Sequence, residues 1–508
     1  MGVELLTDRY KGQIAGVLSC YDRIIIQGTL PKWCYAKGMT DYFYEHQIRI
    51  FDYPKWAEPL RDAIRENMER MAAESGIEIE FVRSRKSFRK EQRVKEILDQ
   101  RGEEPGLVCI LSAMEPCGSY KPWHDKKTHQ TYLKPDDGKC LHYYVYWMDK
   151  DLGLCSLRVP TWCPFRLQFY CNGHSYLARQ LSKRKIAYRV LDNAFGWIAD
   201  FERAQKLADG FCVEMVHRKL DEFAQRYCPV IQRFELSYHW SLDQVEFATD
   251  VVFARQSDLQ AIYDRLTRAA MHTVKPDNIA TFLGRKLNGN YQDEMGNRFH
   301  TRIEGTRIKH TMGPVSIKMY DKFRLVLRIE TTVVNVSFFK HYREVEHRDG
   351  RRTMAWAGMK KTIYSLAPLR ELLLAANRRY LEFISAIEDD KVGMDKLNKI
   401  SQPAEENDRA YRGFNFFDPD DEELFRSLGG GEFNISGFQN RNLRHRLKEK
   451  TSGQISRLMK RLRVHGLIKK VGRTYKYYLT SLGKQVISLG LKLKELYVIP
   501  ALSQASAR

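Results

Sequence analysis

The clearest hydrophobic pattern in the chain lies near its C-terminal end and predicts one amphipathic helix. Four apolar residues recur at the spacing of a single helix face: Ile455, Leu458, Met459 and Leu462. Thr451 or Ser452 can cap the first turn of this helix, and Gly466 can end it in the left-handed conformation that other residues avoid. We therefore expect a helix from residue 452 to residue 465 whose apolar side packs on a core.

Shorter elements are predicted on both sides of this helix. Upstream, the pattern indicates a strand at 432–436, a helix at 439–447 and a turn at 448–452. Downstream, extended segments at 467–471 and 474–480 flank Gly472-Arg473, which is a turn signal, and an apolar-striped helix follows at 481–496. The expected order is strand, helix, turn, helix, hairpin, helix.

This order of elements resembles winged helices of the MarR type, and the resemblance covers residues 431–508. It implies DNA binding, with the helix at 452–465 entering the major groove and the Gly472-Arg473 turn reaching the backbone or the minor groove. It does not imply a particular regulator. The alternative is a winged helix that is used for protein contacts.

The distribution of charge favours nucleic-acid binding. Residues 441–476 hold thirteen Lys or Arg and one acid, Glu449, so they carry +12 of the chain's net +21. Neutralising DNA phosphates requires such a field of one sign. Arg457 and Gln454 are the expected base readers, because Arg pairs with guanine and Gln with adenine through two hydrogen bonds. The other residues expected to contact DNA are Arg441, Arg444, Lys460, Arg461, Lys469, Lys470 and Arg473. Whether RNA competes with DNA stays open.

The rest of the chain alternates extended and helical patterns, which predicts a multi-domain α+β protein. We expect an N-terminal α+β domain at 1–245 and a central domain at 246–400, helical up to about residue 290 and followed by a β-hairpin unit. Residues 401–430 are polar and contain Pro403 and Pro419. They are the expected linker to the winged helix at 431–508.

A candidate catalytic unit lies at 300–332, where two alternating segments flank a connection at 321–323. Alternation places four polar residues on one face: Lys318, Tyr320, Arg328 and Glu330. The preceding strand is expected to add Arg307, Lys309 and His310. Such a group could hold a phosphodiester, with Glu330 as a base or metal ligand and Tyr320 as a nucleophile. The alternative is a half-buried hairpin whose polar face forms salt bridges or binds nucleic-acid backbone.

The segments IKMYDK and LRIE, within residues 316–330, resemble parts of rolling-circle replication initiators of the filamentous-phage gene-II type. This resemblance implies an enzyme that nicks DNA. Members of that family share a His-x-His metal motif, and this chain contains no His-x-His, so the metal ligands of such an enzyme stay unknown. The whole chain also resembles bacterial proteins that end in a winged helix, which implies no activity.

Two further groups have the chemistry of metal ligands. Residues of zinc-ligand type gather between 117 and 142, at spacings that match no closed zinc pattern: Cys117, His124, His129, Cys140 and His142. Buried thiols and loop histidines are the alternative. Three acids at the ends of apolar runs could form a two-metal nuclease centre if the fold joins them: Asp22, Glu115 and Asp192. Acids that form turns are the alternative.

A second basic segment, residues 83–95, holds seven Lys or Arg and one acid. It is either another nucleic-acid contact or a solvated helix face.

Composition narrows the classes of function. No apolar run approaches the roughly 18 residues that a membrane span needs, which predicts a cytoplasmic protein without a membrane partner. Ten cysteines without a secretion signal indicate reduced thiols. No G-x-G-x-x-G or P-loop fingerprint occurs, so no cofactor is evident, and a divalent metal enters only if the chain is an enzyme.

Two functions fit these observations. The first is a DNA-binding protein whose C-terminal winged helix recognises DNA and whose α+β part contacts nucleic acid or partners, with a homodimer as one form of assembly. The second is a mobile-element enzyme, a transposase-like protein or a replication initiator, that nicks or joins DNA. The sequence leaves open whether the chain is an enzyme.

Overall fold

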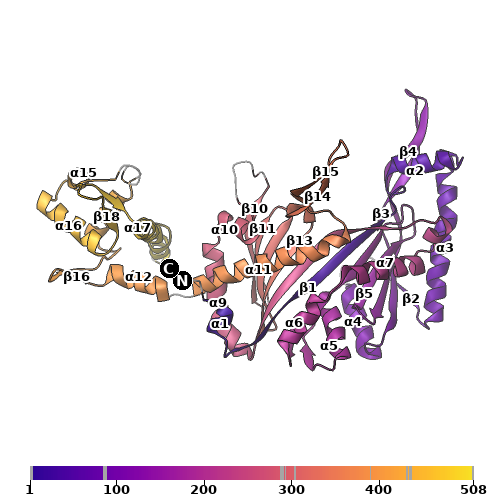
Figure 1. Ribbon diagram of the computed structural model, residues 1–508, viewed down its shortest axis with the longest axis horizontal. Helices are drawn as coiled ribbons and strands as arrows, with labels where there is room; N and C mark the ends of the chain where they lie inside the picture. The colour runs from indigo at the N-terminus through magenta and orange to yellow at the C-terminus, as the bar shows by residue number, and fades with distance from the viewer. Residues whose placement is uncertain are drawn as a thin grey trace. The chain divides into compact units, whose positions relative to one another are not determined.

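The computed structural model shows a mixed α+β protein with a large mixed sheet, as the sequence predicts (Figure 1). The chain forms two compact units, Met1–Glu388 and Asp389–Arg508. The structure describes residues 4–83, 88–286, 291, 293–302, 305–388, 391–430, 433 and 437–505.

An 11-stranded sheet forms the centre of the first unit, in the order β10-β11-β12-β13-β9-β1-β6-β5-β4-β3-β2. Neighbouring strands are antiparallel, except that β2 and β3 are parallel. The strands are β1 (Ile14–Thr29), β2 (Ile79–Phe81), β3 (Gly106–Asp125), β4 (Gln130–Asp149), β5 (Gly153–Pro160), β6 (Leu167–Cys171), β9 (His239–Phe253), β10 (Met295–Arg302), β11 (Gly305–Met312), β12 (Val315–Lys322) and β13 (Val326–Val333).

Helices cover both faces of the middle of this sheet. One face of β9 to β13 packs against α9 (Gln256–Thr273), α10 (Pro276–Phe282) and α11 (Leu366–Glu388). The opposite face of β1 packs against α5 (Gly173–Lys183) and α6 (Phe201–Asp209). The other helices of the unit are α1 (Leu6–Arg9), α2 (Ala36–Glu45), α3 (Tyr53–Glu74), α4 (Lys90–Arg101), α7 (Val213–Tyr227) and α8 (Val230–Arg233). Two small hairpins complete it: β7 (Tyr188–Val190) with β8 (Phe195–Ile198), and β14 (Lys340–Glu346) with β15 (Arg352–Gly358).

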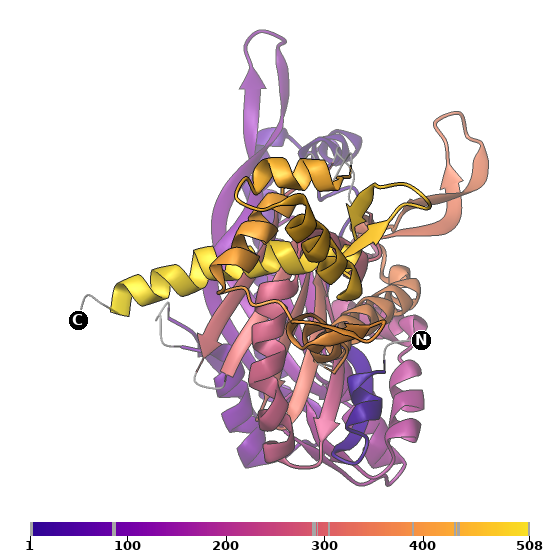
Figure 2. The same cartoon turned by 90° about the vertical axis from the view of Figure 1, so that its left-hand side faces the viewer.

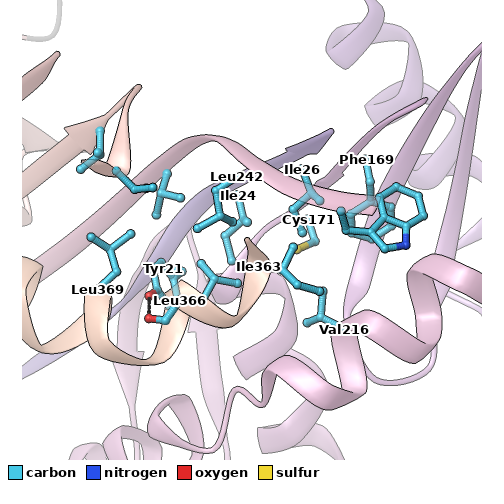
Figure 3. Packing of buried hydrophobic residues seen from close by; sticks show 14 of the residues in the cluster. Tyr21, Ile24, Ile26, Phe169, Cys171, Val216, Leu242, Ile363, Leu366 and Leu369 are labelled. Atoms are coloured by element: carbon cyan, nitrogen blue, oxygen red, sulfur yellow. Dashed lines mark hydrogen bonds between the residues drawn. The ribbon is translucent and has the colours of Figure 1, made fainter. Parts of the chain in front are cut away.

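Part of the apolar core of this unit lies between the sheet and α11. Leu366 and Leu369 lie close to Tyr21 and Ile24 of β1 (Figure 3). The hydroxyl of Tyr21 donates a hydrogen bond to the carbonyl oxygen of Leu366 at 2.5 Å. Burial of this apolar surface is the main force that holds the helix on the sheet.

The boundary expected at residue 245 does not separate two domains in the structure. Residue 245 lies inside β9, which pairs with β1 on one side and with β13 on the other. Backbone pairing therefore joins the expected N-terminal and central domains in one sheet. The helical pattern expected from residue 246 begins only with α9, because residues 246–253 complete the strand.

The second unit contains the elements that the C-terminal pattern predicts. Helix α16 (Ser452–Val464) begins at an N-cap formed by Thr451, and Gly466 follows it with a positive φ of 72°. Helices α15 (Asn440–Arg446) and α17 (Ser481–Leu493) and the hairpin of β18 (Ile468–Lys470) and β19 (Tyr477–Leu479) lie where they are expected. The unit also contains α12 (Lys391–Ser401), β16 (Ala404–Glu406), β17 (Arg409–Tyr411), α13 (Pro419–Leu428), a π-helical turn (Lys494–Val498) and α18 (Ile499–Ala505).

The segment expected as a linker, 401–430, is part of this second unit. Leu424, Phe425 and Leu428 of α13 are fully buried in the same core as Ile455 and Leu462 of α16. Its polar composition reflects an amphipathic helix and its capping residues, of which Asp418 is the N-cap. The strand expected at 432–436 lies outside the described residues except for Phe433.

Candidate functional site

Six of the basic residues expected to contact DNA are exposed on α15, on α16 and on the β18–β19 hairpin. They are Arg441, Arg444, Arg457, Lys469, Lys470 and Arg473, and we call them the basic surface. Within the part of the chain that the structure describes, none of the six forms an ion pair. Their charge is therefore available to an anionic partner.

Several acids of this unit pair with basic residues outside the basic surface. Arg426 pairs with Glu422, and Lys450 pairs with Asp420. On α16 itself, Arg463 lies 3.0 Å from Glu406 of β16, and Lys460 also pairs with Glu406. Lys460 was expected to contact DNA, and in the structure its ammonium already has a carboxylate partner.

Arg461 was also expected to contact DNA, but the structure buries it. Its side chain is 7% exposed and pairs with Asp421 at 2.6 Å between Nη1 and Oδ1. The same guanidinium donates to the carbonyl oxygens of Arg412 and Gly413 and lies 3.8 Å from the ring centre of Phe414. Arg461 therefore holds α16 to α13 and to the preceding loop, and its guanidinium is buried rather than presented to a phosphate.

Gln454, the second expected base reader, takes part in capping α16. Its side-chain oxygen accepts a hydrogen bond from the backbone N–H of Thr451 at 2.7 Å, and Thr451 caps the backbone N–H of Gln454 in return. This reciprocal capping satisfies two backbone donors at the start of the helix. A base that read Gln454 through both its side-chain oxygen and its NH₂ group would compete with that cap for the oxygen.

A second polar group lies in the first unit, on the sheet face opposite α11. Thr331 of β13 donates a hydrogen bond to Asn377 of α11, so the odd-numbered residues of β13 face that helix. Arg328 and Glu330 alternate with them and face the other way. In register, Arg328 lies opposite Tyr320, and Glu330 lies opposite Lys318. The shared face expected for these four residues is confirmed.

Arg328 is completely buried and is surrounded by acids from two other strands. Its guanidinium lies 2.6 Å from Asp250 of β9 and 3.2 Å from Asp22 of β1. It also contacts Nε2 of His174 at 3.0 Å and donates to the carbonyl oxygen of Asn193 at 2.7 Å.

The same contacts set the charges of the two acids. Burial alone would raise the pKa of Asp250, but Arg328 and the hydrogen bond from His174 lower it to about 2. The pKa of Asp22 is lowered in the same way against the effect of burial. Arg328 is thus part of an ionised buried network.

Glu330 is buried and is the centre of the part of this face that contains Lys318 and Tyr320. Its carboxylate accepts hydrogen bonds from Lys318 and from the Tyr320 hydroxyl, each at 2.6 Å. Together with Asp22 and Glu246, it offers carboxylate oxygens that lie within 4.8 Å of one another. The three acids come from the neighbouring strands β13, β1 and β9, and oxygen ligands of this kind suit a hard divalent cation.

Two features oppose catalysis in this arrangement. Burial and the neighbouring Glu330 raise the pKa of Tyr320 well above its usual value, so its phenol is a poor nucleophile as placed. In addition, Lys318 lies 2.6 Å from Glu330 and 3.6 Å from Glu246, and it already balances these carboxylates. A metal ion would have to displace the Lys318 ammonium.

His310 does not join this polar face. Alternation places Lys309 of β11 opposite Lys318, whereas His310 lies opposite Ile317 and faces the core. The His310 ring is buried, with Nδ1 2.7 Å from the Asn297 side-chain oxygen and Nε2 3.1 Å from the Tyr380 hydroxyl. The turn between β12 and β13 also lies two residues later than expected, at 323–325, where Phe323 and Arg324 have positive φ angles.

The triad of Asp22, Glu115 and Asp192 is not assembled. Glu115 is on β3, which is separated from β1 by β4, β5 and β6, and it pairs with Lys90 at 3.0 Å. Asp192 has a 66% exposed side chain. The acids that do accompany Asp22 are Glu246 and Asp250, which stand four residues apart in β9. The sequence pattern does not reveal these two acids, because it predicts a helix rather than a strand at residues 246–253.

The zinc-type residues separate into two groups. Cys140 Sγ lies 3.8 Å from His142 Nδ1, and the hydrogen-bonded Cys117 thiol together with His142 lowers the pKa of Cys140 to about 5. His124 and His129 lie at the far end of the β3–β4 hairpin. The closed ligand set of a structural zinc site is therefore not formed by these five residues.

The basic segment 83–95 is described only in part, since residues 84–87 lie outside the described ranges. Within α4, Lys90 pairs with Glu115, and Arg93 pairs with Glu80 at 2.8 Å. These pairs favour the solvated helix face over a nucleic-acid contact for that part of the segment.

Two cavities lie away from the basic surface and from the polar residues around Glu330. One of about 370 Å³ is beside α7, lined by residues that include His217, Asp221 and Tyr364. The other, of about 160 Å³, is lined by residues that include Cys117, His142 and Arg158. We call Lys318, Tyr320, Arg328 and Glu330 the sheet-face group. Neither cavity is lined by Tyr320 or Glu330, so neither offers a substrate cavity to this group.

Comparison with known proteins gives no relative from which a function could be transferred. No protein-family model, no curated protein and no solved structure matches the chain. Among the described residues, no helix is long and apolar enough to cross a membrane.

Proposed function

We propose that the chain binds DNA through the basic surface of its second unit. The observation that supports this proposal is that the six residues of the basic surface are not among those paired with the described acids of the unit. The six residues of the basic surface are exposed and lack acidic partners among the described residues, while the ion pairs of the unit involve acids of β16, of α13 and its N-cap, or Glu495. A polyanion is the partner that such a surface fits, because each phosphate it neutralises releases a counterion.

The resemblance to winged helices supports DNA as that polyanion. In winged helices the second helix of the helix-turn-helix enters the major groove, which is the role proposed for α16. Arg457 is the proposed base reader, since it is exposed on α16 and has no ion pair among the described residues. Lys469, Lys470 and Arg473 of the hairpin are proposed to hold phosphates. A cytoplasmic location, as the sequence predicts, would give access to DNA.

Arg457→Ala tests this assignment against Arg463→Ala, a matched control. Both arginines are exposed on α16, but Arg463 is paired with Glu406. We expect Arg457→Ala to lower affinity for a duplex selected from a random pool by about 1 to 3 kcal/mol. Lys470→Ala should weaken selected and random duplexes alike and lower the slope of log K against log salt by about one unit. Fluorescence anisotropy of labelled duplexes at several salt concentrations measures both effects.

The control decides the interpretation of that experiment. Arg463→Ala should bind duplex DNA like the unaltered protein, because exposed ion pairs contribute little and its charge is already matched. An equal loss of duplex affinity in Arg457→Ala and Arg463→Ala would mean that only the net charge of the protein matters for binding. The proposed interface on α16 would then be abandoned.

A second candidate function is DNA nicking by the sheet-face group, and the proximity of Asp22, Glu246 and Glu330 favours it. A divalent cation held by these carboxylates could stabilise charge on a phosphodiester. The Tyr320 oxygen would attack phosphorus and give its proton to Glu330, while the bond from phosphorus to the leaving deoxyribose oxygen breaks and that oxygen takes a proton from water.

Incubation with supercoiled plasmid in Mg²⁺, in Mn²⁺ and in EDTA tests this candidate, with Tyr342→Phe as the control tyrosine. Metal-dependent nicking that is lost in Tyr320→Phe and in Glu330→Gln but kept in Tyr342→Phe would establish the enzyme. Binding without nicking in all conditions would leave the sheet-face group as a structural network.

A further inference from the structure

Strands β3 and β4 extend well beyond the sheet as a two-stranded ribbon. Strand β5 pairs only with residues 142–149 of β4, whereas β3 and β4 continue to pair with each other out to Asp125 and Gln130. We call residues 116–125 and 130–139 the β3–β4 ribbon. Figures 1 and 2 both show it projecting from the rest of the first unit.

One face of the ribbon is fixed to the body of the unit. The Tyr120 hydroxyl donates to the carbonyl oxygen of Trp33 at 2.6 Å, and the backbone N–H of Leu133 donates to the Thr40 hydroxyl at 3.0 Å. Tyr120 and Leu133 are both buried. The ribbon is thus held in place, and alternation directs the intervening residues outward.

The outward face carries two cross-strand pairs of unusual composition. Trp123 lies opposite Tyr132, and the neighbouring pair consists of two lysines, Lys121 opposite Lys134. Like charges directly opposite each other destabilise an isolated pair of strands. Lys134 lies 3.7 Å from the centre of the Trp123 ring, and Lys121 is partly compensated by Asp136 at 2.8 Å.

The end of the ribbon adds further positive charge. Residues 121–134 contain four lysines, at 121, 126, 127 and 134, and one acid, Asp125, which gives a net charge of +3. Asp125 accepts a hydrogen bond from the backbone N–H of Lys127, so it is occupied in forming the turn. The Trp123 side chain is 43% exposed despite the lysine beside it.

The β14–β15 hairpin shows that an exposed aromatic pair alone does not single out this surface. Tyr342 lies opposite Trp356 there, and both are exposed. Arg352 pairs with Glu344 and with Glu346 on the same hairpin, so its charges are balanced. Among the described hairpins of this unit, only the β3–β4 ribbon joins an aromatic pair with an exposed ring, that of Trp123, to directly opposed lysines.

We propose that the outward face of the β3–β4 ribbon binds single-stranded nucleic acid. Unpaired bases stack on exposed aromatic rings, and lysines on either side of the ring neutralise the phosphates. The inference rests on the proposed function, since the ribbon supplies a second contact to the same kind of polymer. Bases inside a duplex cannot reach the Trp123 ring, so single strands are the partner that the aromatic pair selects.

The test compares Trp123→Ala with Trp197→Ala in the full-length protein. Trp197 is 45% exposed, nearly the same as Trp123, but it lies on β8 opposite Arg189 rather than on the ribbon. Anisotropy is measured with a labelled oligothymidylate and with a duplex of the same length. We expect Trp123→Ala to weaken single-strand binding about tenfold, with duplex binding unchanged. Trp123→Phe, which keeps a ring, should retain most of the affinity, and the double variant Lys121→Ala/Lys134→Ala should reduce the salt slope by about one unit.

The possible results distinguish a failure of the ribbon site from a failure of the proposed duplex interface on α16. Equal single-strand affinity for Trp123→Ala and Trp197→Ala would overturn the ribbon site, whatever Arg457→Ala does to duplex binding. Equal loss of single-strand and duplex binding in Trp123→Ala would overturn the preference for single strands. If Arg457→Ala leaves duplex binding intact while Trp123→Ala loses the single strand, the ribbon site stands and the basic surface on α16 is wrong.

Discussion

The environment of His310 links a single residue to the pH dependence of stability. Its ring is buried, and burial lowers the pKa of His310 from 6.5 to about 4. As pH falls below about 6.5, the unfolded chain binds a proton that the folded chain does not, so the unfolded state is favoured. The contribution of His310 to stability is therefore complete above about pH 6.5 and is lost as pH falls towards 4.

We expect this loss to reach about 3 kcal/mol, since each pKa unit corresponds to about 1.4 kcal/mol. His310→Gln cannot titrate in this range, so its free energy of unfolding should fall less than that of the unaltered protein between pH 7 and pH 4.5. Denaturant unfolding at several pH values measures the difference. Parallel pH curves for the two proteins would contradict the burial of a neutral His310.

Two arginines on α16 show which contacts of a residue can be predicted from the sequence and which cannot. Arg457 and Arg461 are one helical turn apart and carry the same charge, so the helical pattern treats them alike. Arg457 is exposed, whereas Arg461 pairs with Asp421, 40 positions earlier in the chain. A pairing between residues so far apart leaves no trace in local periodicity. Its only sequence signal is an acid on the apolar side of α13, which was read as part of a polar linker.

At the scale of elements, alternation predicted the β12–β13 face correctly. Lys318, Tyr320, Arg328 and Glu330 share one face because side chains alternate along each strand. Alternation does not say what covers that face, so the burial of Arg328 against Asp22 and Asp250 could not be predicted. The acids that surround it come from β1 and β9, which only the sheet order brings together.

Helix boundaries were predicted well where capping residues accompany the apolar pattern. Helix α16 has Thr451 at its start and Gly466 after its end, and the observed bounds differ from the prediction by one residue. The β12–β13 turn was misplaced because Phe323 and Arg324, which adopt positive φ angles, are not residues that favour such turns. Local chemistry thus predicts an element only where the residues that form its ends are the preferred ones.

At the scale of the whole molecule, composition predicted a multi-domain α+β chain but placed its boundaries wrongly. Polar composition and two prolines predict a linker at 401–430, but α13 within it buries three apolar side chains in the second core. The boundary at residue 245 was placed where the pattern seemed to change from strand to helix. Strand β9 continues across it and joins β1 to β13, so most of the first 388 residues belong to one sheet-centred unit.

The two units have separate hydrophobic cores, and this leads to a prediction about unfolding. Leu327 belongs to the core of the first unit and Leu462 to that of the second, and the two clusters share no residue. Both side chains are fully buried, so replacement by alanine should cost about 2 to 5 kcal/mol through lost burial and the cavity left behind. Differential scanning calorimetry should resolve two transitions, with Leu462→Ala lowering only the transition of the smaller unit and Leu327→Ala only that of the larger. A single transition, lowered by the same amount by either substitution, would mean that the chain unfolds as one cooperative body. Residues that are buried in one core unfold together, wherever they lie in the chain.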